Sequence, residues 1–470
     1  MKKKISVIIL YIALAFGMGG CKKYLDVNPK STLSEDELYT SEVGFQQALT
    51  GIYSLLASRS LYGDNLTMGF VSALAQNYDV SGSTAPFVQT KALNYSSDEV
   101  MEYTQAIWDT AYNAIAGLNK IIANTEKYRS VLTGTNYALI RGEAMGLRAL
   151  LHFEVLRIFG PEYVTGAGVK AIPYKKTADQ YTVVPYVTSE VVAQALADLD
   201  TAAGLLKTTD PILDASPNRR IKMNYYAVKA LEARIRLYSG DKTGAFAAAQ
   251  EVVNSGKFPF VTTSAASAAA GTRDRLYLTE QVFCVRVRDM LDWVDFYFRY
   301  NGSASLKLTR TDAADFNTLY ETASGGGTDL RYLYRIEDDQ GAPFPSKFWQ
   351  TYQFDNLDSN RLDQYVPAIR LSEMYYIMAE TALTPAEGVG YLNTVRTNRA
   401  LPELPTSVTQ ATLDAEITKE YQKEFYAEGQ LFFYYKRKNV VRMQFMTSDI
   451  SLNLYQLPIP EDELEFNPNY

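Results

Sequence analysis

The sequence predicts a mainly α-helical chain of stacked helical hairpins, a tetratricopeptide-like α/α superhelix that carries a long irregular, partly β insert. Three observations predict this class. Several stretches repeat apolar residues at spacings of three and four, the period of one buried helical face. Residues 223–256 span 34 positions, the length of a tetratricopeptide repeat. Between residues 257 and 364 the helical period is lost.

The first expected hairpin joins residues 101–122 to residues 141–160. Each segment carries one apolar helical face, and the short stretch 133–135 between them can form a turn. Gly160 and Pro161 end the second helix, because neither residue continues a helix well. The apolar face of this second helix consists of Ile140, Ala144, Leu147, Leu151, Val155 and Ile158.

Further helices extend the stack. Small residues Ala233 and Ala245 stand where two neighbouring helices must approach closely. Pro385 stands at the start of a helix, where its missing N–H is not needed. A stack of such pairs buries a continuous core that no single pair could bury. These helices are expected over residues 221–240, between Asp241 and Gly256, over 368–383, over 387–399 and, as one long helix, over about 412–437.

The insert, about residues 257–364, is too long for a simple connection. Gln281–Arg288 alternates around two valines and is expected to form a short strand, and Ser324–Thr328 contains three glycines typical of a loop tip. Long irregular segments on a rigid scaffold usually carry function. We therefore expect the ligand-binding surface on this insert.

The amino terminus has the pattern of an export signal. Lys2 to Lys4 precede an apolar run from Ile5 to Phe16, which suits a signal-peptide core and is too short to span a bilayer. Small residues then lead directly to Cys21, an arrangement that resembles the lipobox of bacterial lipoproteins. We expect residues 1–20 to be a lipoprotein signal peptide and 21–470 to be a single domain, attached to the membrane by lipid on Cys21. The alternative is an ordinary secretory signal with an incidental cysteine.

Composition excludes several functional classes. The formal charge is −7, a poor match to nucleic acid, so no nucleic-acid partner is expected. Two cysteines and one histidine argue against a disulfide framework and against zinc sites built from Cys and His. His152 alone cannot complete a Ser-His-Asp arrangement, and we interpret it as structural. No catalytic residue, metal site or cofactor is predicted.

Aromatic residues give the strongest indication of a ligand site. Met290–Tyr300 and Lys347–Phe354 are rich in aromatic residues, and an early loop holds the trio Asn77 to Asp79. A Trp or Tyr ring can cover the apolar face of a sugar while Asp, Asn or Arg beside it bonds the hydroxyls. The alternative is that these rings pack the insert onto the helices. The candidate ligand-binding residues are Asn77, Tyr78, Asp79, Asp292, Trp293, Tyr297, Arg299, Tyr300, Trp349 and Tyr352.

Five segments carry a family resemblance. They are CKKYLDVNP (21–29), GLRALLHFEVLRIFG (146–160), VPAIRLSEMYYIMAETAL (366–383), YLNTVRTNRALPEL (391–404) and LPIPEDELEFNPN (457–469). In this order, behind the lipobox, they resemble motifs of the SusD/RagB family of outer-membrane nutrient-binding lipoproteins of Bacteroidetes. These motifs are framework, so the resemblance assigns no ligand contact position by position.

The resemblance implies a surface lipoprotein of the outer membrane that binds oligosaccharide without cleaving it. Such a protein hands its cargo to a SusC-like TonB-dependent transporter, on which family members sit as a lid. Three alternatives stay open at this point. The cargo can be peptide, the protein can be a surface glycosidase with a carboxylate pair, or it can be a helical scaffold with no small ligand.

The chain departs from the family pattern near Glu428. Tyr421 and Leu431 replace arginines and Tyr434 replaces an aspartate of that pattern. We expect a buried ion pair to be exchanged here for apolar packing, a change that is often neutral or stabilising.

Overall fold

The structure is a computed structural model that describes residues 35–80, 82, 84–179, 181–214, 217–288, 290–299, 307–310, 312–339, 341–349 and 365–470. Its helices are α2 (Glu35–Leu38), α3 (Glu42–Leu56), α4 (Phe70–Leu74), α5 (Val88–Lys91), α6 (Asp98–Lys127), α7 (Asn136–Phe159), α8 (Tyr163–Gly166), α9 (Thr188–Leu206), α10 (Tyr225–Tyr238), α11 (Lys242–Asn254), α12 (Thr263–Ala266), α13 (Met290–Arg299), α14 (Ala313–Leu319), α15 (Leu330–Arg335), α16 (Leu371–Thr381), α17 (Pro385–Asn398), α18 (Gln410–Glu424), α19 (Gln430–Arg437) and α20 (Glu461–Phe466). Its strands are β1 (Lys170–Ile172), β2 (Tyr186–Val187), β3 (Gln281–Arg286), β4 (Ile336–Asp339), β5 (Ala342–Pro345) and β6 (Tyr365–Arg370).

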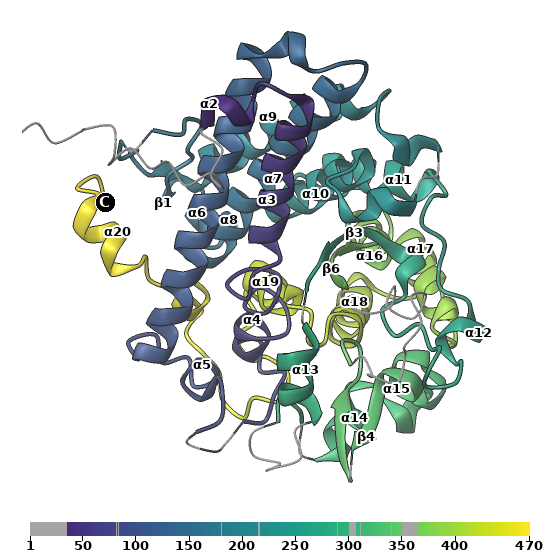
Figure 1. Cartoon of the computed structure of the whole chain (residues 1–470). Coiled ribbons are helices and arrows are strands. Elements are labelled where there is room, and N and C mark those ends of the chain that lie inside the picture. Colours follow the sequence, from purple (N-terminus) through teal and green to yellow (C-terminus); the bar gives the residue numbers. More distant parts are fainter. Residues whose placement is uncertain are drawn as a thin grey trace, which may run out of the picture.

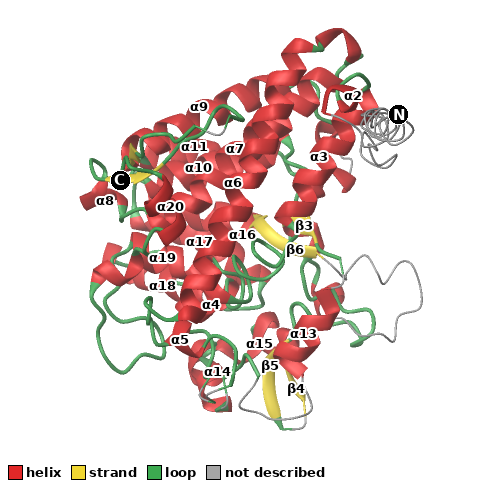
Figure 2. Cartoon of the chain, turned by 60° about the vertical axis from the view of Figure 1, so that its left-hand side comes forward, coloured by secondary structure: helices red, strands yellow, loops and turns green. Residues whose placement is uncertain are grey.

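Helical hairpins dominate the molecule, as the periodicity predicts (Figure 1). Helix α7 packs between α6 and α9, α10 packs on α11, and α16 packs on both α11 and α17. Secondary-structure colouring shows how few strands the fold contains (Figure 2). The mainly α-helical fold with a partly β insert is therefore confirmed. The sequence patterns did not predict helices α3 and α9.

Helix α7 is the centre of the stack. All its residues from Gly142 to Phe159 are buried, so even its polar side chains need partners. Arg148 pairs with Asp198 of α9 at 2.7 Å. Gly142 permits the close approach of α9, because a Cβ there would lie 2.7 Å from the Leu206 side chain. This burial explains why the segment carries apolar residues on more than one face.

The single long helix expected over 412–437 is wrong, because the chain breaks it into α18 and α19. Gly429 stands at the break with φ +77°, a left-handed conformation that favours glycine. A Cβ at this position would lie 2.2 Å from the Leu66 carbonyl oxygen. Where apolar packing was expected in place of an ion pair, Tyr421 and Tyr434 stack with ring centroids 4.1 Å apart.

The insert contains more helix than its sequence pattern indicates. The short helices α12 to α15 all fall inside it, which corrects the expectation of an insert without regular helices. The expected strand is confirmed as β3, which pairs antiparallel with β6. In both views α13, α14, α15 and β4 lie together at one end of the molecule, beyond the β3–β6 pair (Figures 1 and 2).

Buried ion pairs fasten the insert to the helical stack. Arg331 of α15 reaches Glu424 of α18 at 3.0 Å, and the Lys347 ammonium reaches Glu428 at 2.6 Å. Arg370 contacts both carboxylates, at 3.0 and 2.9 Å. Because charges this deep need partners, the network fixes how the insert lies on the stack. Within the described ranges, no helix combines the length and apolarity needed to cross a bilayer.

Candidate ligand-binding surface

Helix α13 carries four of the candidate residues and is amphipathic. Met290, Val294, Tyr297 and Phe298 are buried, whereas Asp292 and Phe296 are exposed. Trp293 is half-buried at the boundary between the two faces. The helix therefore packs one side onto the stack and presents the other side to solvent.

The Trp293 indole is held at one end and open at the other. Its Nε1–H donates to the Gly63 carbonyl at 3.2 Å. The Arg59 guanidinium lies 5.3 Å from the ring centroid, and the Arg59 side chain is 56% exposed. The arrangement combines an apolar ring with an accessible cation, which suits a ligand with both apolar and polar surface.

Tyr297 and Asp64 form the base of this surface. The Tyr297 hydroxyl donates to Asp64 Oδ2 at 2.8 Å and accepts from Arg59 at 2.7 Å. Arg59 also pairs directly with Asp64 at 2.7 Å. Burial raises the pKa of the Asp64 carboxyl, while the Arg59 charge opposes that rise. The triad fixes the position of Arg59 beneath the exposed face, and Tyr297 itself is buried.

Trp349 and Arg299 contact each other within the insert. The Arg299 guanidinium is 4.1 Å from the Trp349 ring centroid, and that of Arg275 is 4.9 Å away. Phe344 meets the same indole edge-on at 5.7 Å. Arg299 also pairs with Asp295 one helical turn away, at 3.1 Å. Trp349 is half-buried, as Trp293 is, but two guanidiniums rather than one lie against its ring.

Two of the three residues in the early loop, Asn77 to Asp79, are buried. Tyr78 is fully buried and its hydroxyl donates to the Met68 carbonyl at 2.5 Å. Asn77 is buried too, and its side-chain oxygen accepts from the Ala427 N–H at 3.0 Å. Asp79 is partly exposed and pairs with Lys91 at 3.2 Å. Asn77 and Tyr78 therefore hold the loop in place, and only Asp79 reaches solvent. Cys21, Tyr300 and Tyr352 lie outside the described residues.

A groove of about 650 Å³ opens beside the Trp293 cluster. It lies between the end of α3 and the end of β3, and chain continuity joins it to the cluster because Ser58 precedes Arg59 and Arg288 precedes α13. Sequence reasoning missed this groove, whose residues come from three separate parts of the chain. Its described lining residues are Thr50, Tyr53, Ser54, Ala57, Ser58, Ile221, Lys222, Val285, Arg286 and Arg288.

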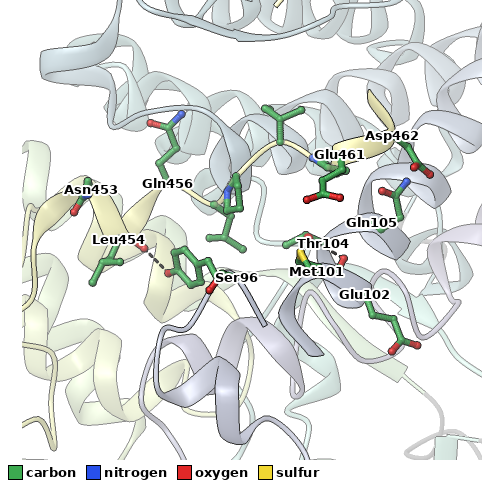
Figure 3. Close-up of a pocket in the computed structure, with 15 residues that line it drawn as sticks. Ser96, Met101, Glu102, Thr104, Gln105, Asn453, Leu454, Gln456, Glu461 and Asp462 are labelled. Atoms are coloured by element: carbon green, nitrogen blue, oxygen red, sulfur yellow. Dashed lines mark hydrogen bonds between the residues drawn. The ribbon is translucent and has the colours of Figure 1, made fainter. Parts of the chain in front are cut away.

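A second groove, of about 800 Å³, lies between the start of α6 and the carboxy-terminal segment (Figure 3). Tyr95 donates to the Leu454 carbonyl at its edge. Three carboxylates, Glu102, Glu461 and Asp462, stand among its lining residues. None of the candidate residues lies here. The groove is built by the LPIP segment, which the sequence marks as framework.

His152 is structural, as expected. Its Nδ1–H donates to the Arg148 carbonyl at 2.9 Å, and Nε2 accepts from the Lys175 N–H at 3.0 Å. Burial lowers the pKa of the ring to about 3, so it stays neutral. In the part of the chain that the structure describes, no group of three or more His, Cys, Asp or Glu could hold a metal ion.

Two family models match the chain. One, described as starch-binding and associating with outer membrane, matches residues 23–237, and the SusD family model matches residues 293–449. Two curated relatives come from Formosa agariphila. SusD-like protein P2 is 23% identical over all of this chain and 98% of that protein. SusD-like protein P25 is 25% identical over 40% of this chain and 37% of its own length.

Solved structures share the fold. A SusD-like carbohydrate binding protein from Bacteroides vulgatus ATCC 8482 superposes with a TM-score of 0.72 at 18% identity, covering 91% of this chain and 97% of that one. The two family models together match most of the chain, and the chain belongs to the SusD/RagB family.

Proposed function

We propose that this protein binds oligosaccharide nutrients at the outer-membrane surface and delivers them to a SusC-like TonB-dependent transporter. The family model described as starch-binding and associating with outer membrane supports this role, and so does the carbohydrate-binding relative of the same fold. Binding is non-covalent and leaves the glycosidic bonds intact. The protein is held on the membrane by lipid at Cys21.

One observation carries the proposal on this chain. Trp293 stands half-exposed on the insert beside an exposed guanidinium, Arg59, and an exposed carboxylate, Asp292. An indole covers the C–H face of a pyranose ring, and charged groups at its edge bond the ring hydroxyls. Trp108 is buried, and the half-buried Trp349 already carries the Arg275 and Arg299 guanidiniums against its ring. Trp293 is therefore the stacking residue of the site.

Replacement of this ring tests the proposal. Trp293→Ala should weaken binding of an oligosaccharide identified on a glycan array by about tenfold or more, because the ring contributes most of the stacking contact. Phe466→Ala is the matched control, since Phe466 is a strongly exposed ring on α20, remote from the insert in sequence. Calorimetric titration gives the affinities, and thermal unfolding checks that both variants fold.

Two results would contradict this assignment. Equal affinity of Trp293→Ala and the parent removes Trp293 from the site. Tighter binding of peptides than of any glycan on the same array assigns the protein to peptide cargo, and release of shorter sugars by the purified chain makes it a glycosidase.

The anchor has its own test. Cys21→Ser should move the protein from the membrane fraction to the soluble fraction, because one cysteine would carry all the acyl chains. Membrane fractionation with immunoblotting measures this, and a variant that stays with the membrane contradicts acylation at Cys21.

A further inference from the structure

The groove beside Trp293 is strongly cationic. Lys222, Arg286 and Arg288 line it, and its described lining residues include no carboxylate. The whole chain carries a formal charge of −7, so this local excess of positive charge runs against the composition. Strand alternation puts Arg286 on the same face of β3 as Cys284, whose thiol points to the Arg220 carbonyl. That face is turned toward the segment that carries Lys222.

These cations are available to a ligand. Arg286 and Arg288 are exposed, and neither forms an ion pair with any described residue. The Lys222 ammonium lies 4.2 Å from the Tyr53 ring centroid and has no carboxylate partner among the described side chains. Burial lowers the pKa of Lys222, and the charge of the nearby Glu143 opposes this shift.

Carboxylates close to the groove are already occupied. Glu143, behind Tyr53, accepts from the Tyr53 hydroxyl at 2.7 Å and pairs with Arg219 at 2.7 Å. Arg219 pairs in addition with Asp210 at 3.0 Å. The fold therefore neutralises the arginine one layer deeper and leaves the groove cations unpaired.

The cations, rather than the hydroxyls, are the donors that the groove presents. Ser58 lines the groove, but its Oγ is closed to solvent and has no hydrogen-bond partner in the described part of the chain. The hydroxyls of Thr50 and Ser54 already donate to backbone carbonyls of their own helix. Three cations without an ion-pair partner among the described residues form a set of donors that suits an oxyanion. The volume of about 650 Å³ falls in the range of small-ligand pockets.

We propose that this groove binds the anionic group, carboxylate or sulfate ester, of an acidic oligosaccharide whose neighbouring ring stacks on Trp293. The inference rests on the proposed function and adds the substrate class. Arg286 and Arg288 contact the anion, and Lys222 closes the inner end of the groove. Because Ser58 lines the groove and directly precedes Arg59 in the chain, the bound anion lies close to the stacking ring.

Paired probes test the charge preference. A hexamer of galacturonic acid is compared with its fully methyl-esterified form, and a κ-carrageenan hexamer with its desulfated form, by calorimetric titration of the full chain. The charged member of at least one pair should bind about tenfold or more tighter than its neutral partner. This advantage should shrink at high salt, because screening weakens contacts between charges. The pair with the larger difference distinguishes carboxylate from sulfate.

Variants locate the preference in the groove. Arg286→Gln and Arg288→Gln should each reduce affinity for the charged probe about threefold to tenfold, and should leave the neutral probe within about twofold. Arg442→Gln is the matched control, because Arg442 is an exposed arginine outside the groove lining. It should change neither affinity. Both groove arginines are exposed, so their loss should not prevent folding.

Each of the other possible results contradicts a specific part of the proposal. Equal affinity of the parent for charged and neutral partners rejects the anionic substrate class and leaves the oligosaccharide function standing. Failure of all four probes and of maltohexaose to bind at millimolar concentration rejects both the anionic substrate class and the oligosaccharide-binding function. Tighter binding of a poly-glutamate peptide than of every glycan means that the same cations serve an acidic peptide, which also rejects the inference.

Discussion

Two charged regions of the molecule differ in how their charges are partnered. At the junction of the insert with α18, Glu424 receives Arg331, Arg370 and Arg399 within 3.0 Å, and all four side chains are buried. In the groove beside Trp293, Arg286 and Arg288 have no ion-pair partner among the described residues. Buried, partnered charges hold a fold together, whereas exposed charges without partners contribute little to folding and can contact a ligand. The comparison separates the residues expected to govern stability from those expected to govern binding.

The largest effect is expected at the junction. Glu424→Gln leaves three buried arginines short of a carboxylate, which should lower the free energy of unfolding by about 3–5 kcal/mol. Chemical denaturation monitored by circular dichroism measures this. Glu416→Gln, on the same helix but partly exposed, should change it by less than about 1 kcal/mol. A loss at Glu424 no larger than at Glu416 would break the distinction between the two regions.

A buried lysine gives the intermediate effect, through pH. The Lys436 ammonium donates to the Arg157 and Gly160 carbonyls at 2.7 and 2.6 Å, and burial lowers its pKa to about 7. Between pH 7 and 9 the unfolded chain, whose lysine titrates near its ordinary value, binds more protons than the folded chain at this position. Stability contributed by this group therefore rises with pH across that window, by about 1–2 kcal/mol.

Lys436→Met removes this titration. Its unfolding free energy should rise less between pH 7 and 9 than that of the parent, as measured by urea denaturation at each pH. Lys207→Met, at an exposed lysine, should keep the pH dependence of the parent. Parallel curves for the parent and Lys436→Met would show that this lysine stays charged in the folded protein over the whole window.

The smallest effect on stability is expected in the groove, where the arginines have no ion-pair partner among the described residues. The double variant Arg286→Gln/Arg288→Gln should unfold within about 0.5 kcal/mol of the parent, because exposed cations without partners contribute little to folding. Thermal and chemical unfolding measure this. A loss of several kcal/mol in the free energy of unfolding would show that these arginines stabilise the fold, as the junction residues do. It would argue against their role in ligand binding.

The helical stack could be predicted from its sequence because its signal is local. The apolar spacing of α7 and the proline at the start of α17 each depend on a few neighbouring residues. The break between α18 and α19 was missed, since Gly429 is required by a close approach to Leu66, far away in the chain. Helix α13 could have been found, because Met290, Val294 and Tyr297 follow helical spacing.

The candidate site was only partly predictable. The described residues 290–299 reach the surface at Asp292 and Phe296, whereas nothing in the trio Asn77 to Asp79 indicated that Asn77 and Tyr78 are buried. The Asn77 side chain accepts from the N–H of Ala427, far away in the chain, and the Tyr78 hydroxyl donates to the nearby Met68 carbonyl. The groove was invisible for the same reason, because Ser58, Lys222 and Arg286 meet only after folding.

The hydrogen bond from the Trp293 indole to the Gly63 carbonyl has a consequence for the energetics of capture. Because this bond and the packing of α13 restrict the rotamers of the side chain before any cargo arrives, little conformational entropy remains to be lost there on association. Affinity at this ring should therefore depend on how well a sugar face matches a preset plane. Cargo selection would then act through shape, with dissociation rates varying more than association rates among related sugars.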